Sequence, residues 1–119
     1  MGNPFGHVEL QTQDVAKAKK FYKALFDWKF QEIPDIDYTL IEVGEGTGGG
    51  MMKNPVPGSP SHWMAYVTVE DIQATIRKAD SLGAKGLKEV TECPGYGSFC
   101  IIADPTGAAL ALWQEKEKI

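Results

Sequence analysis

A pattern in the first half of the chain returns in the second half. Residues 7–26 read HVELQTQDVAKAKKFYKALF, and residues 64–82 read MAYVTVEDIQATIRKADSL. Each begins with a short alternating stretch typical of a strand, reaches an aspartate, and continues with apolar residues at helical spacing. The two aspartates, Asp14 and Asp71, lie 57 positions apart (71 − 14) in a chain of 119 residues, which is nearly half its length. The sequence therefore predicts two similar modules in one chain.

Each aspartate occupies the position of a helix N-cap, because its side chain can accept a hydrogen bond from the first helical turn. The helices are predicted to end near Asp27 and at Gly83. Three strand-like runs follow each helix, at residues 28–33, 38–43 and 49–53 in the first module and at 85–90, 98–103 and 108–114 in the second. We expect an apolar stripe on each helix to be buried: Val15, Ala18, Phe21, Tyr22 and Leu25 in the first, and Ile72, Thr75, Ile76, Ala79 and Leu82 in the second.

The predicted fold class is α+β, with two βαβββ modules in a single domain that spans residues 1–119. The first module covers residues 1–54 and the second covers residues 62–119. Residues 55–61 are the linker, since three prolines between positions 55 and 60 cannot continue a helix or a central strand. One helix covers only one face of its sheet, so the other face needs a partner. We expect curved mixed sheets around a cleft between the modules, a location typical of small-molecule sites.

Composition and charge exclude several functions. Sixteen acidic and twelve basic residues give a net charge of −4, which argues against binding to nucleic acid or to an anionic membrane. No stretch has the ~18 apolar residues of a membrane helix. The opening MGNPFGHVEL also lacks the basic start and apolar run of an export signal, so we expect a cytoplasmic protein. Cys93 and Cys100 are predicted to be reduced and structural, with a pocket-lining Cys100 as the alternative.

Three stretches of the sequence resemble the vicinal oxygen chelate superfamily, the group of glyoxalase I, bleomycin resistance protein and extradiol dioxygenases. They are His7-Val8 with Asp14 and the aromatic-rich run up to Trp28, the Gly-Gly-Met-Met run at 49–52, and Asp-Pro-Thr-Gly-Ala at 104–108. Together they span nearly the whole chain. The resemblance implies two βαβββ modules forming a cleft, and it is nearest to small glyoxalase-like or bleomycin-resistance-like proteins. Because related folds pair, we also expect a homodimer.

The resemblance further implies where a metal would bind, through His, Glu or Gln side chains on the first and last strands of each module. The matching positions here are His7, Met64, Ala111, and either Gly50 or Met52. Of these, only His7 can ligate a hard cation, which needs at least three nitrogen or oxygen ligands. We therefore expect no metal cofactor.

Strand alternation indicates which side chains face the cleft. In the first strand, His7, Glu9 and Gln11 lie opposite the helix-facing Val8 and Leu10. The loop at 94–97 either covers the cleft as a lid or forms a tight hairpin. The cleft lining is predicted to be largely aromatic and apolar, with the candidate ligand-binding residues Met52, His62, Met64, Tyr66, Tyr96 and Trp113.

His7 and Glu9 are the candidate catalytic residues, and three roles are open to them. They can form a hydrogen-bonded pair that orients a ligand, act in acid–base catalysis, or join His62 in an unusual divalent-metal site. The sequence predicts a metal-free protein that binds a small apolar or aromatic molecule. The alternatives are a lyase, isomerase or dioxygenase with a rebuilt site, and a subunit whose role is assembly.

Overall fold

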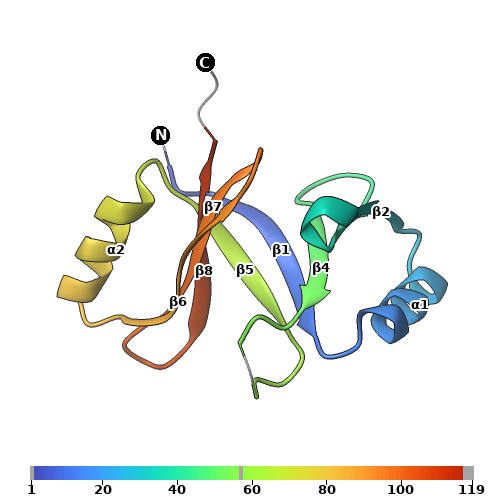
Figure 1. Cartoon of the computed structure of the whole chain (residues 1–119), viewed down its shortest axis with the longest axis horizontal. Coiled ribbons are helices and arrows are strands. Elements are labelled where there is room, and N and C mark those ends of the chain that lie inside the picture. The colour runs from blue at the N-terminus through green and yellow to red at the C-terminus, as the bar shows by residue number, and fades with distance from the viewer. Residues whose placement is uncertain (1, 57, 117–119) are drawn as a thin grey trace. The chain divides into compact units, whose positions relative to one another are not determined.

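The computed structural model describes residues 2–56 and 58–116, which fall into two compact units. The N-terminal unit is Gly6–Met64; the C-terminal unit comprises the described residues of Met1–Phe5 and Ala65–Ile119. Both units contain a helix and a mixed sheet, so the predicted α+β fold class is confirmed (Figure 1). Pro57, part of the predicted linker, lies outside the described residues.

The N-terminal unit has the predicted strand–helix–strand–strand–strand order. Its elements are β1 (Phe5–Thr12), α1 (Val15–Leu25), β2 (Lys29–Ile33), the 3₁₀ turn η1 (Pro34–Ile36), β3 (Tyr38–Glu42) and β4 (Gly49–Lys53). The strands lie in the order β2-β3-β4-β1. The β1–β4 pair is parallel, and the β2–β3 and β3–β4 pairs are antiparallel. Helix α1 packs against β4, so it covers one face of this sheet.

The C-terminal unit repeats the same arrangement. Its elements are β5 (His62–Thr68), whose residues up to Met64 belong to the N-terminal unit, α2 (Ile72–Ser81), β6 (Lys85–Cys93), β7 (Gly97–Ala103) and β8 (Ala109–Glu115). The strand order is β5-β8-β7-β6. Again the first and last strands of the module pair in parallel. Residues near the N-terminus join this unit, because the backbone nitrogen of Thr68 donates to the Pro4 carbonyl at 3.0 Å.

The helix starts agree with the N-cap predictions. The Asp14 carboxylate accepts a hydrogen bond from the Lys17 backbone nitrogen at 3.0 Å. The Asp71 carboxylate accepts one from the Ala74 backbone nitrogen at 3.1 Å. The two modules therefore begin their helices by the same device, which satisfies one backbone donor of each first turn.

Each unit has its own apolar core on the helix side of the sheet. In the N-terminal unit, buried Leu10, Ile41 and Met51 pack with partly buried helix and strand residues that include Tyr22 and Trp28. In the C-terminal unit, the buried residues are Val69, Ile72, Cys100 and Leu112. Cys100 thus lies in the core beneath α2, in agreement with its predicted structural role.

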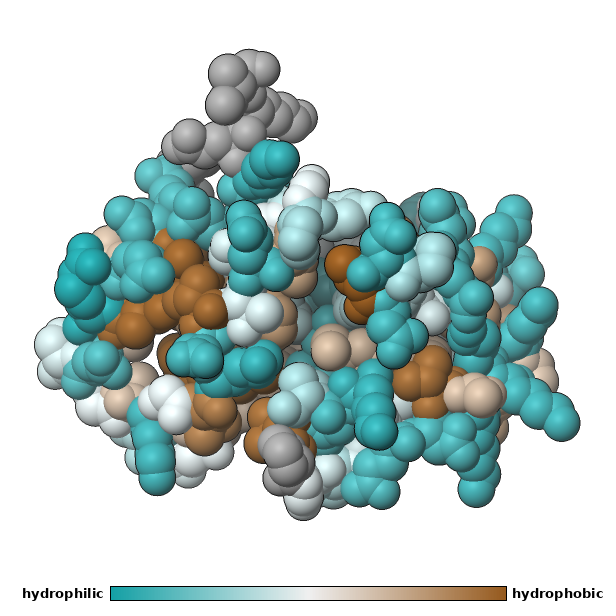
Figure 2. Space-filling model, viewed as in Figure 1, coloured by the Kyte–Doolittle hydropathy of each residue, from teal (hydrophilic) through white to brown (hydrophobic). Residues whose placement is uncertain are grey.

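The expectation that both helical stripes are buried is wrong for three side chains. Phe21 is 57% exposed, Leu25 56% and Leu82 68%. The α1 residues that pack against the core are Val15, Ala18 and Tyr22, which form a narrow stripe along the helix. Phe21 lies beside this stripe and is therefore exposed. Leu25 is the last residue of α1, and Leu82 caps α2 rather than belonging to it. Figure 2 shows brown apolar patches interrupting a largely hydrophilic face of the molecule.

The turn at residues 94–97 is a tight hairpin between β6 and β7. The Tyr96 backbone nitrogen donates to the Cys93 carbonyl at 2.9 Å, and Gly95 has a φ of +87°. Glycine adopts this left-handed conformation without the steric cost that other residues have. The Tyr96 side chain is 48% exposed.

Within the described part of the chain, no helix is long and apolar enough to cross a membrane.

Candidate functional site

Strand β1 separates apolar and polar side chains onto opposite faces of its sheet. Leu10 packs into the core beneath α1. His7, Glu9 and Gln11 alternate with it and therefore share the other face, as predicted. Glu9 is only 2% exposed and Gln11 is fully buried. A carboxylate and an amide at such depth need hydrogen-bond partners, because burial without them is costly.

Hydrogen bonds connect these side chains through Tyr38 of β3. The His7 Nε2 and the Tyr38 hydroxyl are 2.7 Å apart, and the Tyr38 hydroxyl donates to Glu9 Oε1 at 2.8 Å. On the other side of the carboxylate, Gln11 Nε2 donates to Glu9 Oε2 at 2.7 Å. We call these four residues, His7, Tyr38, Glu9 and Gln11, the polar row.

The direction of these hydrogen bonds fixes the tautomer of His7. A phenol has one proton, and that of Tyr38 is donated to Glu9, so the Tyr38 oxygen acts as the acceptor toward His7. The proton of the ring therefore lies on Nε2, and Nδ1 is the nitrogen at which the imidazole takes up a second proton. This assignment follows from the hydrogen-bond pattern.

Burial lowers the pKa of His7 from its ordinary value of 6.5, and the nearby Glu9 carboxylate opposes this shift. Burial is the larger effect, because moving the imidazolium out of water costs more than the carboxylate recovers. His7 is therefore a neutral imidazole near pH 7. A neutral ring can act as a base, whereas an imidazolium cannot.

Tyr38 reaches Glu9 across an intervening strand. Strand β4 lies between β3 and β1, and its Gly50 is the register partner of both Leu40 and Glu9. A Cβ atom at Gly50 would meet the Tyr38 hydroxyl and ring at distances that real side chains do not adopt. The missing side chain of Gly50 is thus what allows the tyrosine to cross β4. Gly50 is one of the two positions that the family resemblance gives for a metal ligand on this strand. Here it leaves the space in which the Tyr38 side chain lies.

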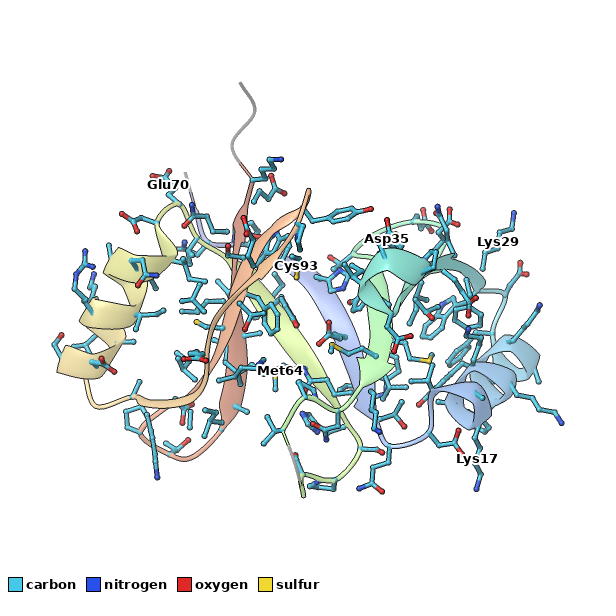
Figure 3. All side chains as sticks on the ribbon, viewed as in Figure 1. Lys17, Lys29, Asp35, Met64, Glu70 and Cys93 are labelled. Atoms are coloured by element: carbon cyan, nitrogen blue, oxygen red, sulfur yellow. The ribbon has the colours of Figure 1, made fainter. Side chains whose placement is uncertain are left out.

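Gln11 contains an unsatisfied polar atom. Its Oε1 is buried and has no hydrogen-bond partner, and no other buried side-chain nitrogen or oxygen in the described residues is in this state. Its Nε2 also lies 3.6 Å from the sulfur of Met64, which projects from β5 (Figure 3). Met52 is the β4 register partner of Gln11. Two of the predicted ligand-binding residues, Met52 and Met64, therefore lie beside the polar row.

The remaining predicted residues lie elsewhere. The Nδ1 of His62 is 2.7 Å from the Pro60 carbonyl and donates to it. In the C-terminal unit, Tyr66 is buried, packs against Phe99 with ring centroids 6.1 Å apart, and shares the face opposite α2 with Trp113. Tyr96 is in the β6–β7 hairpin. The prediction that these residues line one cleft with His7 and Glu9 stays a prediction.

In the described part of the chain, the candidate donor side chains do not form a three-ligand cluster. Among residues 2–56 and 58–116 there is no group of three or more His, Cys, Asp or Glu side chains that could hold a metal ion. His7 and Glu9 are both engaged with the Tyr38 hydroxyl, and His62 is bonded to a backbone carbonyl. These side chains are therefore not arranged as the three-ligand site considered from the sequence.

Sequence reasoning missed Tyr38. It placed Gln11 on the correct face without giving it a role. The signal for Tyr38 is present in the sequence, since the run Gly49-Gly50 leaves a gap on the polar face of the strand beside the tyrosine. Recognising it requires the strand register, which brings Leu40, Gly50 and Glu9 into one line across the sheet.

Comparison with known proteins finds longer relatives of this chain. The chain is 32% identical over 107 residues to "Putative glyoxylase CFP32" of Mycobacterium bovis, covering 87% of this chain and 41% of that protein. It is 24% identical to "Anthracycline biosynthesis protein DnrV" of Streptomyces peucetius, with 90% and 45% covered. The chain thus spans less than half the length of these curated relatives.

A solved structure and a family profile give the same result. The crystal structure of hypothetical protein BH1468 from Bacillus halodurans has a TM-score of 0.69 at 14% identity, with 100% of this chain and 99% of that chain covered. This likeness concerns the fold alone. Residues 5–112 match the family model described as "Glyoxalase/Bleomycin resistance protein/Dioxygenase superfamily". The chain belongs to the glyoxalase/bleomycin resistance protein/dioxygenase superfamily.

Proposed function

We propose that the chain binds a small molecule, without a metal, at the sheet face opposite α1 that carries the polar row. The observation behind this proposal is the nearly complete burial of Glu9 within a row of directed hydrogen bonds. A face with a purely structural role is more stable with apolar side chains. The reason is that hydrogen bonds between buried polar groups contribute little more free energy than the hydrogen bonds with water that these groups give up. Such a network is expected where it orients a ligand.

The surroundings of the polar row favour a ligand with an apolar or aromatic body. Met52 and Met64 lie beside Gln11, and thioether side chains adapt to irregular apolar surfaces. The name of the relative DnrV refers to anthracycline biosynthesis, and anthracyclines have fused aromatic rings. This supports a flat ligand whose polar substituent meets the row.

A ligand screen followed by mapping tests this proposal. Aromatic compounds are screened by thermal shift, because a ligand that binds only the folded state raises its melting temperature. Binders are then mapped by amide chemical shifts, which we expect to change along β1, β3 and β4. Binding should persist after dialysis against a chelator. A library without a single stabilising compound, or shifts confined to other strands, would overturn the proposal.

The hydrogen-bond direction also supports a second candidate function, acid–base catalysis of the lyase or isomerase type. When Nδ1 of His7 accepts a proton, the Nε2 proton, the Tyr38 hydroxyl and the Glu9 carboxylate form a directed row that stabilises the imidazolium. This arrangement suits removal of a proton from a carbon atom next to a carbonyl group. The reaction would use side chains of the N-terminal unit alone.

Proton exchange in deuterated water tests the second function. A set of 2-oxo acids, aldehydes and thioesters is incubated with the protein, and loss of the proton next to the carbonyl is followed by NMR. We expect exchange with the native protein and with His62→Asn, and its loss in His7→Asn. Exchange that survives in His7→Asn would contradict a role for His7 as the base.

A further inference from the structure

The carbonyl oxygen of the Gln11 side chain is an acceptor with a fixed orientation. Gln11 Nε2 donates to Glu9 Oε2 at 2.7 Å, which identifies the amide nitrogen, since a flipped amide would bring its oxygen against a carboxylate oxygen. The Oε1 atom therefore points away from Glu9. It is buried and has no partner within the described residues.

An acceptor of this kind is unusual in a folded protein. Most buried side-chain oxygens have a protein or water partner, and an unpaired one destabilises the folded state. Gln11 is the last member of the polar row, whose hydrogen bonds are short and well directed. The unsatisfied atom is thus part of an ordered network, and a bound molecule or a water must complete it.

The neighbourhood determines which group can complete it. Glu9 and Gln11 both present oxygen atoms here, so a carbonyl, nitro or ether oxygen would be repelled, whereas an O–H or N–H group would be attracted. Met64 and Met52 are the apolar neighbours of Gln11, and their unbranched side chains can move to admit a ring. The site selects for a donor on an apolar body.

We propose that the Oε1 atom of Gln11, a residue with Met52 and Met64 as neighbours, is a specificity-determining subsite that accepts a hydrogen bond from an O–H or N–H group on an aromatic ligand. This inference rests on the proposed small-molecule binding and specifies the ligand class. Phenols and indoles carry the required donor, whereas their O- or N-methylated forms lack it. The subsite discriminates between them because a methylated ligand leaves the buried oxygen unpaired.

Matched probe pairs test this inference. Phenol is compared with anisole, and indole with 1-methylindole, by titration into ¹⁵N-labelled protein. The side-chain NH₂ signals of Gln11 report directly on its amide. We expect the donor member of each pair to bind about tenfold more tightly and to shift these signals, as expected when a buried acceptor gains its partner.

Two variants supply the controls. Gln11→Met keeps a similar volume without the acceptor, so the preference for phenol and indole should disappear. Gln31→Met changes an exposed glutamine on β2 and should leave the preference unchanged. If Gln11→Met does not fold, the probe pairs and the Gln11 signals of the native protein still decide the question.

The outcomes separate this inference from the proposed function. Equal binding of both members of each pair along β1 supports the proposed function and overturns the subsite. The subsite is also overturned if a long-lived water is seen beside the Gln11 amide in the presence of bound phenol. Absence of binding along β1, β3 and β4 by all four probes and by every compound of the thermal-shift library overturns both.

Discussion

The Tyr38 hydroxyl lies over the bare backbone of Gly50, in the space that a side chain at position 50 would fill. Through this gap the hydroxyl reaches from β3, across β4, to the Glu9 carboxylate of β1. The polar row therefore depends on a residue that contributes no functional group. This dependence can be tested by adding a single methyl group.

Gly50→Ala should break the Tyr38–Glu9 hydrogen bond and lower the free energy of unfolding by about 1–3 kcal/mol, because the added Cβ displaces the tyrosine. Urea unfolding measures the loss, and the Tyr38 ring signals report the displacement. Gly86→Ala is the matched control, since a Cβ there meets nothing within 4 Å. In a Tyr38→Ser background the cost of Gly50→Ala should shrink. An equal cost in both backgrounds would show that the tyrosine is not the obstacle.

The lowered pKa of His7 predicts a dependence of stability on pH. The unfolded chain binds a proton at this histidine below its ordinary pKa of 6.5, while the folded protein, with its lower pKa, resists protonation. Stability from His7 is therefore complete above pH 6.5 and is lost as the pH falls from 6.5 toward the folded pKa. Urea unfolding at several pH values measures this slope. The slope should diminish in His7→Gln, and an unchanged slope would show that other groups cause it.

The sequence was sufficient to predict the module order, the strand faces and the helix starts. The evidence for them is local: Asp14 and Asp71 precede helical periodicity, and alternation around Leu10 identifies the core face of β1. Gly49–Lys53 was predicted with its observed bounds, and β6 extends three residues beyond its prediction. Such features depend on neighbours in sequence and are readable from one chain.

The site was predicted only in part, because its connections depend on strand register. His7 and Glu9 were predicted to share a face, but their link through Tyr38 joins residues 31 and 29 positions apart. The predicted burial of Phe21 was wrong for a different reason. Helical spacing identifies a stripe of apolar residues, but it does not tell how wide a part of that stripe the sheet covers. Both errors concern tertiary contacts that periodicity does not encode.

The two N-caps should contribute equally to stability, since they make the same hydrogen bond in corresponding positions. Asp14→Ala and Asp71→Ala are each expected to lower the free energy of unfolding by about 1 kcal/mol, because one backbone donor of each helix loses its partner. The asparagine variants should cost much less, since asparagine caps helices almost as well. Urea unfolding of the four variants provides the comparison. Alanine variants as stable as the native protein would contradict a capping role.

Burial separates two apolar residues of the N-terminal unit. Met51→Ala should lower the free energy of unfolding by about 2–5 kcal/mol, because its side chain is completely buried in the core. Phe21→Ser should cost about 0.5 kcal/mol or less, because Phe21 is 57% exposed. Chemical denaturation under the same conditions tests both variants. Equal losses would mean that Phe21 is covered in solution, which would point to a contact beyond this chain.

The Cys100 thiol should resist modification in the folded protein. It is 1% exposed, and burial raises its pKa above the ordinary value of 9.0, so both access and thiolate formation are suppressed. N-ethylmaleimide should therefore label Cys100 only slowly at pH 9, and rapidly once urea unfolds the chain, as followed by mass spectrometry of the peptide. Cys93 is half-buried and provides the internal comparison. Rapid native labelling of Cys100 would show that the core beneath α2 opens readily, because no reagent reaches this sulfur without such an opening.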